Sequence, residues 1–219
     1  MIKEKEMSRA QDALAAQLRE LPMVKVTKEY IFTTASGAPA TLRNLFSNKK
    51  QLIVYHFMLA PGEAEGCTGC SFMAEHFADP RLLATKDTAF TAVSRAPIAD
   101  IEAYRARTGW QFPWVSSYGT DFNYDFQATL DDAHGDYNFR TRAEAVALSK
   151  RAPGNGDMPG LTVFYREGEH VYRTYSAYAR GLDRFANTFQ FLDVTPLGRQ
   201  QGPLGPGEFK RNYEYDAEE

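Results

Sequence analysis

The spacing of apolar residues predicts strands alternating with helices through the centre of the chain. Residues 51–58 are almost entirely apolar or aromatic, as in a strand covered on both faces of a sheet. Apolar side chains then recur at helical intervals over residues 67–77, and residues 88–94 again fit a strand. A helix over residues 97–109 follows, with proline at its start and glycine at its end. The pattern therefore predicts consecutive strand–helix units.

The N-terminal part of the chain adds a helix and short strands to this pattern. A capping-box motif at Ser8–Gln11 opens a predicted helix, which Pro22 ends. Alternating apolar residues predict strand structure over residues 24–34, and residues 40–46 predict a short helical segment. We expect this region to lead into the first central strand.

The C-terminal half closes the predicted fold with a hairpin and a helix. A capping-box motif at Thr141–Glu144 opens a short helix, and residues 161–175 predict a hairpin. Apolar residues at helical spacing predict a final helix over residues 182–192. Residues 196–219 are rich in glycine, proline and charge, so they are predicted to stay flexible unless they dock on the body.

Composition and charge narrow the class of protein. A chain of 219 residues with 43% hydrophobic residues can bury one substantial core. We expect an N-terminal helical extension over residues 1–22, one domain over 23–195 and a flexible tail over 196–219. The net charge of -3, without a long Lys/Arg run, argues against nucleic-acid or anionic-membrane partners. The charged N-terminus and the lack of a long apolar stretch predict a cytoplasmic protein.

Candidate chemistry lies in the stretch EGCTGCSF, which contains both cysteines of the chain, Cys67 and Cys70. In the cytoplasm a close cysteine pair is more often catalytic, redox-sensing or metal-binding than a structural disulfide. A tetrahedral zinc site would need further ligands. The four histidines show no spacing typical of a metal-binding pair: His56, His76, His134 and His170.

The spacing of the cysteines predicts separate roles for them. Residues three apart on a helix share a face, so the sulfurs of Cys67 and Cys70 can approach disulfide distance. Cys67 would lie at the helix N-terminus, where backbone N–H groups stabilise a thiolate, and is predicted to be the exposed nucleophile. Cys70, one turn inside, would resolve the mixed disulfide. Nearby carboxylates, Glu63 and Glu65, are expected to limit the lowering of the pKa.

Other interpretations of the pair remain open. Two small, easily buried residues can simply occupy a core helix. The chain can also be a noncatalytic module that binds a metal or a protein partner through its thiols. Pro61, six residues before Cys67, faintly resembles the active-site loop of peroxiredoxins, but no Thr or Ser lies between the two residues.

A second element supports the redox interpretation. Met158 and Pro159 stand immediately before the predicted hairpin. This arrangement resembles thioredoxin-like proteins, in which a proline at this place, usually in the cis form, packs beside the cysteine pair and its backbone binds substrate. The resemblance implies a cis Met158–Pro159 bond close to Cys67, with both residues binding substrate.

Segments along nearly the whole chain are similar to a bacterial thioredoxin-like family of unknown function, described as predicted dithiol-disulfide oxidoreductases. They read YHFM, GCTGCSF, VSRAP, FPWVSS, DFNYDF, PGLTVFY, TYSAYARGLD and LDVTPLGR. The resemblance implies a thioredoxin-like α/β fold, a central mixed sheet flanked by helices, with Cys67 and Cys70 as the redox pair. Thr68 and Gly69 replace the Gly-Pro dipeptide of thioredoxin itself, which leaves the redox potential open.

The function expected from the sequence is thiol-disulfide exchange without a dissociable cofactor and without a metal. Its substrate would be a disulfide-containing protein or a small-molecule disulfide, and a reductase would recycle the oxidised pair. The aromatic residues between 110 and 126 are expected to be mostly core, although a ligand pocket or a dimer face also fits them. The oligomeric state stays open, with a homodimer among the alternatives.

Overall fold

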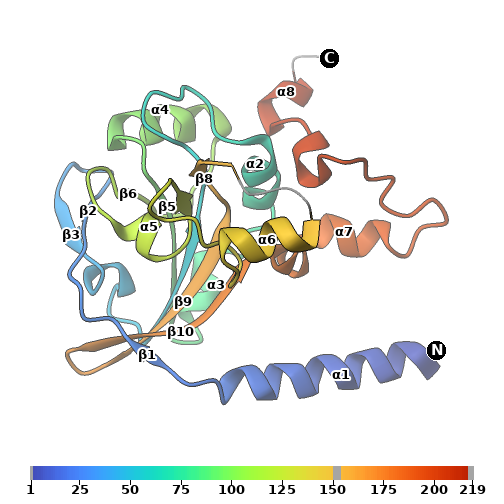
Figure 1. Ribbon diagram of the computed structural model, residues 1–219. Helices are drawn as coiled ribbons and strands as arrows, with labels where there is room; N and C mark the ends of the chain where they lie inside the picture. Colours follow the sequence, from blue (N-terminus) through green and yellow to red (C-terminus); the bar gives the residue numbers. More distant parts are fainter. Residues whose placement is uncertain (1, 150–153, 217–219) are drawn as a thin grey trace.

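The central sheet determines where the cysteine pair lies. The computed structural model describes residues 2–149 and 154–216. Within these residues, eight strands form one sheet in the order β1-β10-β9-β4-β5-β6-β2-β3 (Figure 1). Their bounds are β1 Val24–Lys25, β2 Ile31–Thr33, β3 Pro39–Thr41, β4 Gln51–His56, β5 Thr88–Ser94, β6 Trp114–Ser116, β9 Gly160–Glu167 and β10 His170–Tyr178. A separate pair joins β7 (Thr129–Leu130) to β8 (Gly156–Asp157).

Strand directions make the fold thioredoxin-like. The central strand β4 runs parallel to β5 and antiparallel to β9, and β10 pairs antiparallel with β9. The chain passes from β4 through helix α2 (Thr68–Ala74) to β5, and a later hairpin supplies the other edge. The predicted α/β class with a mixed central sheet is therefore confirmed. Strands β4, β5 and the β9–β10 hairpin lie where the apolar pattern predicted them.

Two apolar layers cover the sheet. On one face Tyr55 of β4 and Phe57, just after its end, pack with the cysteine helix α2 and with α4 (Ile98–Thr108). On the other face Leu52 and Val54 pack against α5 (Phe122–Asp125). The aromatic residues between 110 and 126 are mostly core, as predicted: Trp110, Phe112, Trp114, Phe122 and Phe126 are buried.

The remaining helices differ from the predicted ones mainly at their ends. Helix α1 covers Ile2–Arg19, so the predicted start at Ser8 is wrong: the Ser8 hydroxyl donates to the Glu4 carbonyl inside a continuing helix. The predicted Thr141–Glu144 capping box is confirmed at the start of α6. The other helical segments are η1 Asn44–Phe46, α3 Pro80–Ala84, α6 Arg142–Ser149, η2 Ala179–Phe185, α7 Asn187–Leu192, η3 Gly205–Glu208 and α8 Asn212–Asp216.

Two predicted helical segments take another form. Residues 40–46 begin as strand β3 and only then form the short 3-10 helix η1. The final helix is interrupted at Ala186, which is extended (φ -103°, ψ 95°), so η2 and α7 replace one continuous helix. Among the described residues no helix is both long and apolar enough to cross a membrane.

The N-terminal helix and the C-terminal segment differ in how they contact the rest of the molecule. Helix α1 extends away from the sheet in Figure 1, and none of its described residues is buried. At the other end, η3 and α8 lie beside α2 and α4 (Figure 1), although the sequence predicted a flexible tail there. The aromatic side chains of Phe209 and Tyr213 pack against the core cluster that contains Cys70.

Candidate active site

The cysteine pair is positioned by the turn from β4 into α2. Cys67 is the N-cap residue of α2, and its backbone N–H donates to the Met58 carbonyl at 3.1 Å. The preceding residue, Gly66, has no room for a side chain: an added Cβ would overlap the Phe57 ring and lie 2.8 Å from the Tyr104 ring. The sequence therefore fixes a tight approach of this turn to the aromatic core.

Cys67 is half-buried and its thiol is acidic. The Cys70 thiol acts as a hydrogen-bond donor toward its sulfur, and the backbone N–H groups of Cys70 and Gly69 point to the same atom. Arg211 adds positive charge. These interactions outweigh burial and lower the pKa of Cys67 to about 6. A large fraction of Cys67 is therefore thiolate at neutral pH.

Cys70 has the opposite character. Only 1% of the residue is exposed, and burial raises the pKa of its thiol well above the ordinary value. The Tyr55 hydroxyl donates to its sulfur at 3.5 Å, and the Met58 backbone N–H donates at 3.4 Å. Both cysteines carry free thiols. An acidic half-buried thiol thus stands one helical turn from a protonated, buried one.

The limiting effect of Glu63 and Glu65 on the acidity of Cys67 stays a prediction, but both carboxylates have partners of their own. The Glu63 carboxylate accepts the backbone N–H of Ala60. Glu65 is paired with two arginines, Arg107 at 3.0 Å and Arg211 at 3.4 Å, so its charge is compensated.

Arg211 is a site residue that sequence reasoning missed. Its guanidinium donates to the Gly66 carbonyl at 2.9 Å, directly before Cys67, and only 15% of its side chain is exposed. It comes from the segment predicted as a flexible tail. Its spacing from the cysteines gives no signal, because nothing in the local pattern links residues so far apart in sequence.

Pro159 lines the same cavity as Cys67 and Cys70, whereas Met158 does not line it. The predicted cis bond between Met158 and Pro159 is wrong: no cis peptide occurs among the described residues. The backbone N–H of Met158 donates to Ala128 at 3.0 Å, which continues the β7–β8 pairing toward β9. A trans bond suits this extended approach, since the residue before proline favours extended backbone.

The cavity beside the pair is small and mainly apolar. It has a volume of about 340 Å³. Residues from the sheet, α2, η2 and the C-terminal segment line it: Tyr55, Met58, Cys67, Gly69, Cys70, Met73, Pro159, Ala179, Arg180, Leu182, Asp183, Leu204, Pro206 and Gly207. A second cavity of about 540 Å³ shares Tyr55, Met73 and Leu182 with it, so the two adjoin.

The two histidines nearest to the cysteines in sequence, His56 and His76, form hydrogen bonds with other residues. The buried His56 ring pairs with the Thr162 hydroxyl at 3.0 Å, and burial lowers its pKa to about 3. The His76 ring contacts the Phe72 carbonyl and the Thr188 hydroxyl, both at 2.7 Å. In residues 2–149 and 154–216 no group of three His, Cys, Asp or Glu side chains could hold a metal ion.

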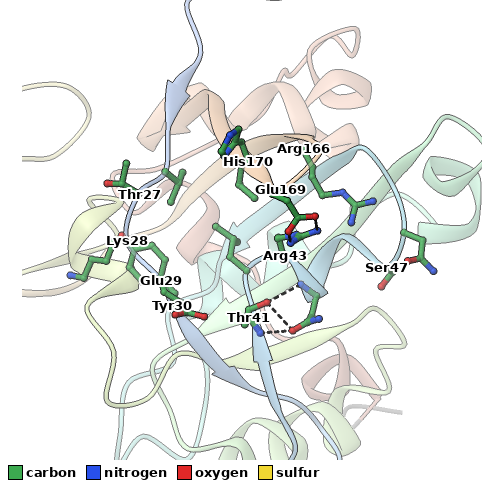
Figure 2. Close-up of a pocket in the computed structure, with 15 residues that line it drawn as sticks. Thr27, Lys28, Glu29, Tyr30, Thr41, Arg43, Ser47, Arg166, Glu169 and His170 are labelled. Carbon is green, nitrogen blue, oxygen red and sulfur yellow. Dashed lines mark hydrogen bonds and ion pairs between the residues drawn. The ribbon is translucent and has the colours of Figure 1, made fainter.

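A wider polar cleft, of about 670 Å³, contains neither cysteine. Figure 2 shows Arg43 and Glu169 facing each other there as an ion pair, with Arg166 and His170 nearby. The cleft lies between the β2–β3 region and the β9–β10 turn. Both cysteines border the apolar cavity of about 340 Å³ instead.

Comparison with known proteins agrees with the family resemblance of the sequence. A family profile described as "Bacterial protein of unknown function (DUF899)" matches residues 1–215. The chain belongs to this family. A comparison with curated protein sequences gives no match.

Several solved structures are similar to the chain at low identity. A cysteine-to-serine mutant of PrxQ from Xylella fastidiosa has 13% identity and a TM-score of 0.46, covering 74% of this chain and 88% of its own. Peroxidoxin BcpB from Mycobacterium tuberculosis has 14% identity and a TM-score of 0.42, covering 78% and 96%. Bacterioferritin comigratory protein from Xanthomonas campestris has 16% identity and a TM-score of 0.45, and the match covers 75% of this chain and 91% of that protein. The fold assignment rests on the strand order described above.

Proposed function

We propose that the protein is a thiol-disulfide oxidoreductase in which Cys67 attacks a substrate disulfide and Cys70 resolves the product. One observation carries this proposal: the pKa of Cys67 is lowered to about 6 while the pKa of its buried partner Cys70 is raised. A half-buried thiolate that borders a cavity, beside a protonated second thiol, is the arrangement that exchange requires.

The reaction balances within the two thiols. The Cys67 thiolate attacks one substrate sulfur, the substrate S–S bond breaks, and the other half leaves as a thiolate. Cys70 gives its proton to the departing thiolate and attacks the Cys67 sulfur, which expels the second half as a thiolate that takes a proton from water. The substrate gains two electrons and becomes two thiols, while the protein is oxidised to a Cys67–Cys70 disulfide.

The groups around the pair support these steps. Tyr55 and the Met58 N–H donate to the Cys70 sulfur, so they would stabilise its thiolate as it forms. Pro159 borders the cavity of the pair. Pro159 and the preceding Met158 are proposed to position substrate. The cycle needs no dissociable cofactor, and a cellular dithiol reductase would return the disulfide to its reduced form.

The noncatalytic alternative has weaker support. Within residues 2–149 and 154–216, no third His, Cys, Asp or Glu side chain lies close enough to join the two thiols around a metal ion. A metal-binding module would therefore need further ligands from elsewhere. A partner-binding module would have no need for a nucleophile with a lowered pKa.

Trapping the mixed disulfide tests the proposal. The Cys70→Ser protein should retain a substrate half on Cys67 as a stable adduct, detected by intact-mass measurement and peptide mapping. The Cys67→Ser protein is the matched control and should form none. Adduct formation on Cys70 in the Cys67→Ser protein, with none in the Cys70→Ser protein, would reverse the assignment. The absence of any adduct in both variants would refute the exchange activity.

A further inference from the structure

The backbone beside Pro159 is already occupied. Binding of an extended peptide along this edge would need unpaired main-chain groups. The Met158 N–H is bound to the Ala128 carbonyl, and the Pro159 carbonyl accepts the Tyr137 hydroxyl at 2.9 Å. The same hydroxyl accepts the Ala179 N–H, which fixes it in place. Neither of these two backbone groups is available to pair with a polypeptide.

The other side of the dithiol is covered by residues 204–213, which we name the C-terminal strap. The Thr68 hydroxyl, between the two cysteines, donates to the Gly207 carbonyl at 3.2 Å. Pro206 and Gly207 lie directly over Gly69, within 3.6 Å of the position that a Cβ would take there. Leu204, Pro206 and Gly207 then line the cavity of the pair. The strap therefore forms one wall of the site.

Aromatic and polar contacts hold the strap in this position. The Phe209 ring stacks on Phe72 of α2, with ring centroids 4.2 Å apart. Arg211 binds the Gly66 carbonyl, and the Asn212 side chain donates to the Thr108 carbonyl at the end of α4 at 2.7 Å. These contacts reach both helices on this face of the sheet, so the wall is anchored at several points.

The space that remains has the size and polarity of a small-molecule site. Two adjoining cavities of about 340 and 540 Å³ meet at Tyr55, Met73 and Leu182. Pockets for small ligands generally have volumes of about 300–1,000 Å³ and mostly apolar walls. The charged residues at the smaller cavity, Arg180 and Asp183, form an ion pair at 3.5 Å. The apolar part of a ligand would extend into the larger cavity.

We infer that the substrate is a small disulfide bearing an apolar or aromatic group, and that the C-terminal strap excludes extended polypeptides. This inference rests on the proposed function, since it names the substrate class of the same dithiol. The Cys67 thiolate attacks the sulfur nearer to it, and the apolar half lies along Tyr55 and Met73. Electron flow and leaving groups are those of the exchange given above, with a small thiol as each product.

Selectivity is measured with three disulfides under single-turnover conditions. The probes are dithiodipyridine, which is neutral and aromatic, oxidised glutathione, which is charged, and an unfolded protein with one disulfide. Each rate constant is divided by that of free dithiothreitol with the same disulfide, which removes differences in intrinsic reactivity. The wild-type protein should favour dithiodipyridine over the protein disulfide by about 100-fold or more, and over glutathione disulfide by about tenfold.

Loosening the strap should reduce this preference. In Phe209→Ala the stacking on Phe72 is lost, and the ratio between small and protein disulfides should fall by about tenfold. Because both rates depend on the same thiolate, their ratio is independent of any change in the pKa of Cys67. Phe191→Ala, at a residue that is 73% exposed, is the matched control and should keep the wild-type ratio.

The possible results distinguish the substrate assignment from the exchange activity itself. Leu204→Ala changes a cavity wall at a residue that is 73% exposed, so it tests the wall without disturbing the core. Equal normalised rates for all three disulfides in the wild-type protein, or an unchanged ratio in both Phe209→Ala and Leu204→Ala, would overturn the substrate assignment while leaving exchange intact. If no disulfide reacts at Cys67, the proposed function itself fails.

Discussion

At the scale of single residues, the acidity of Cys67 depends on donors from its own helical turn and on one distant arginine. Hydrogen bonds from the Cys70 thiol and from the backbone N–H groups of Cys70 and Gly69 lower the pKa of Cys67 most. The positive charge of Arg211, in the strap, lowers it further. Burial alone would raise the pKa of Cys67, as it does for Cys70. The difference between the two thiols is therefore a property of their contacts, not of the residue type.

Alkylation of Cys67 should follow this acidity. The pKa of Cys67 is lowered to about 6, so Cys67 becomes protonated as the pH falls through that value. At neutral pH its ionisation is nearly complete. The rate of reaction with iodoacetamide, mapped to Cys67 by mass spectrometry, should therefore level off near pH 7. A rate that continues to rise toward an ordinary thiol pKa of about 8.5 would contradict the assignment.

Replacing Arg211 should shift the same curve. In Arg211→Met the midpoint should move to higher pH, and the alkylation rate at pH near 6 should fall by about two- to fivefold. Arg43→Met is the control, because it removes the same charge from an ion pair with Glu169 in the polar cleft. Identical curves for the two variants would show that Arg211 has no specific effect on Cys67.

A side chain at Gly66 should destabilise the turn that presents Cys67. The added Cβ of Gly66→Ala would overlap the Phe57 ring, which is 1% exposed and unable to move without disturbing the core. We expect a loss of about 1–3 kcal/mol in the free energy of unfolding, measured by chemical denaturation. Gly181→Ala, whose Cβ would meet one methyl group at 3.5 Å, should change stability far less. Equal stability of the two variants would contradict the packing argument.

At the scale of elements, the β7–β8 pair determines where Pro159 lies. Asp157 of β8 binds Arg95, just after β5, at 2.6 Å, and accepts the Thr129 hydroxyl of β7 at 2.7 Å. Only 5% of the Asp157 side chain is exposed. The Arg95 side chain is 21% exposed, so both partners of this ion pair are largely removed from water. This contact ties the segment before Pro159 to the carboxyl end of a central strand.

Breaking this ion pair should cost more than breaking an exposed one. Asp157→Asn should lower the free energy of unfolding by about 2–3 kcal/mol, because Arg95 would lose its charged partner in a mostly buried place. Asp121→Asn, in the exposed pair of Asp121 (68% exposed) with Lys28, should cost less than about 1 kcal/mol. Comparable losses in the two variants, measured by denaturant unfolding, would refute the special role of Asp157.

The sequence predicted elements well where periodicity was long. Strand β5 coincides with its predicted residues, and α4 ends at Gly109, which adopts a left-handed conformation with φ 75°. The strands β7 and β8 have two residues each, too few to show a period, and were not predicted. The cis Met158–Pro159 bond was predicted by resemblance alone, and the structure has no cis peptide among its described residues.

At the scale of the whole molecule, the cysteine pair lies between the sheet and the C-terminal strap. The strap covers it from the C-terminal side, and Leu18 of α1 borders the larger cavity. Cys67 and Cys70 could be named from the sequence because their motif is local and follows a predicted strand, and Pro159 could be named by resemblance because it directly precedes one. The strap could not, because its anchors, Phe209, Arg211 and Tyr213, are isolated among glycine, proline and charge.

Equilibration with glutathione redox buffers tests directly whether Cys67 and Cys70 form a redox pair. The wild-type protein should close one intramolecular Cys67–Cys70 disulfide in a single two-electron step, seen as the loss of two hydrogens in intact mass. Neither single Cys→Ser variant should close it. Retention of both thiols under oxidising buffer, or separate stable glutathione adducts on Cys67 and Cys70 without closure, would contradict the account.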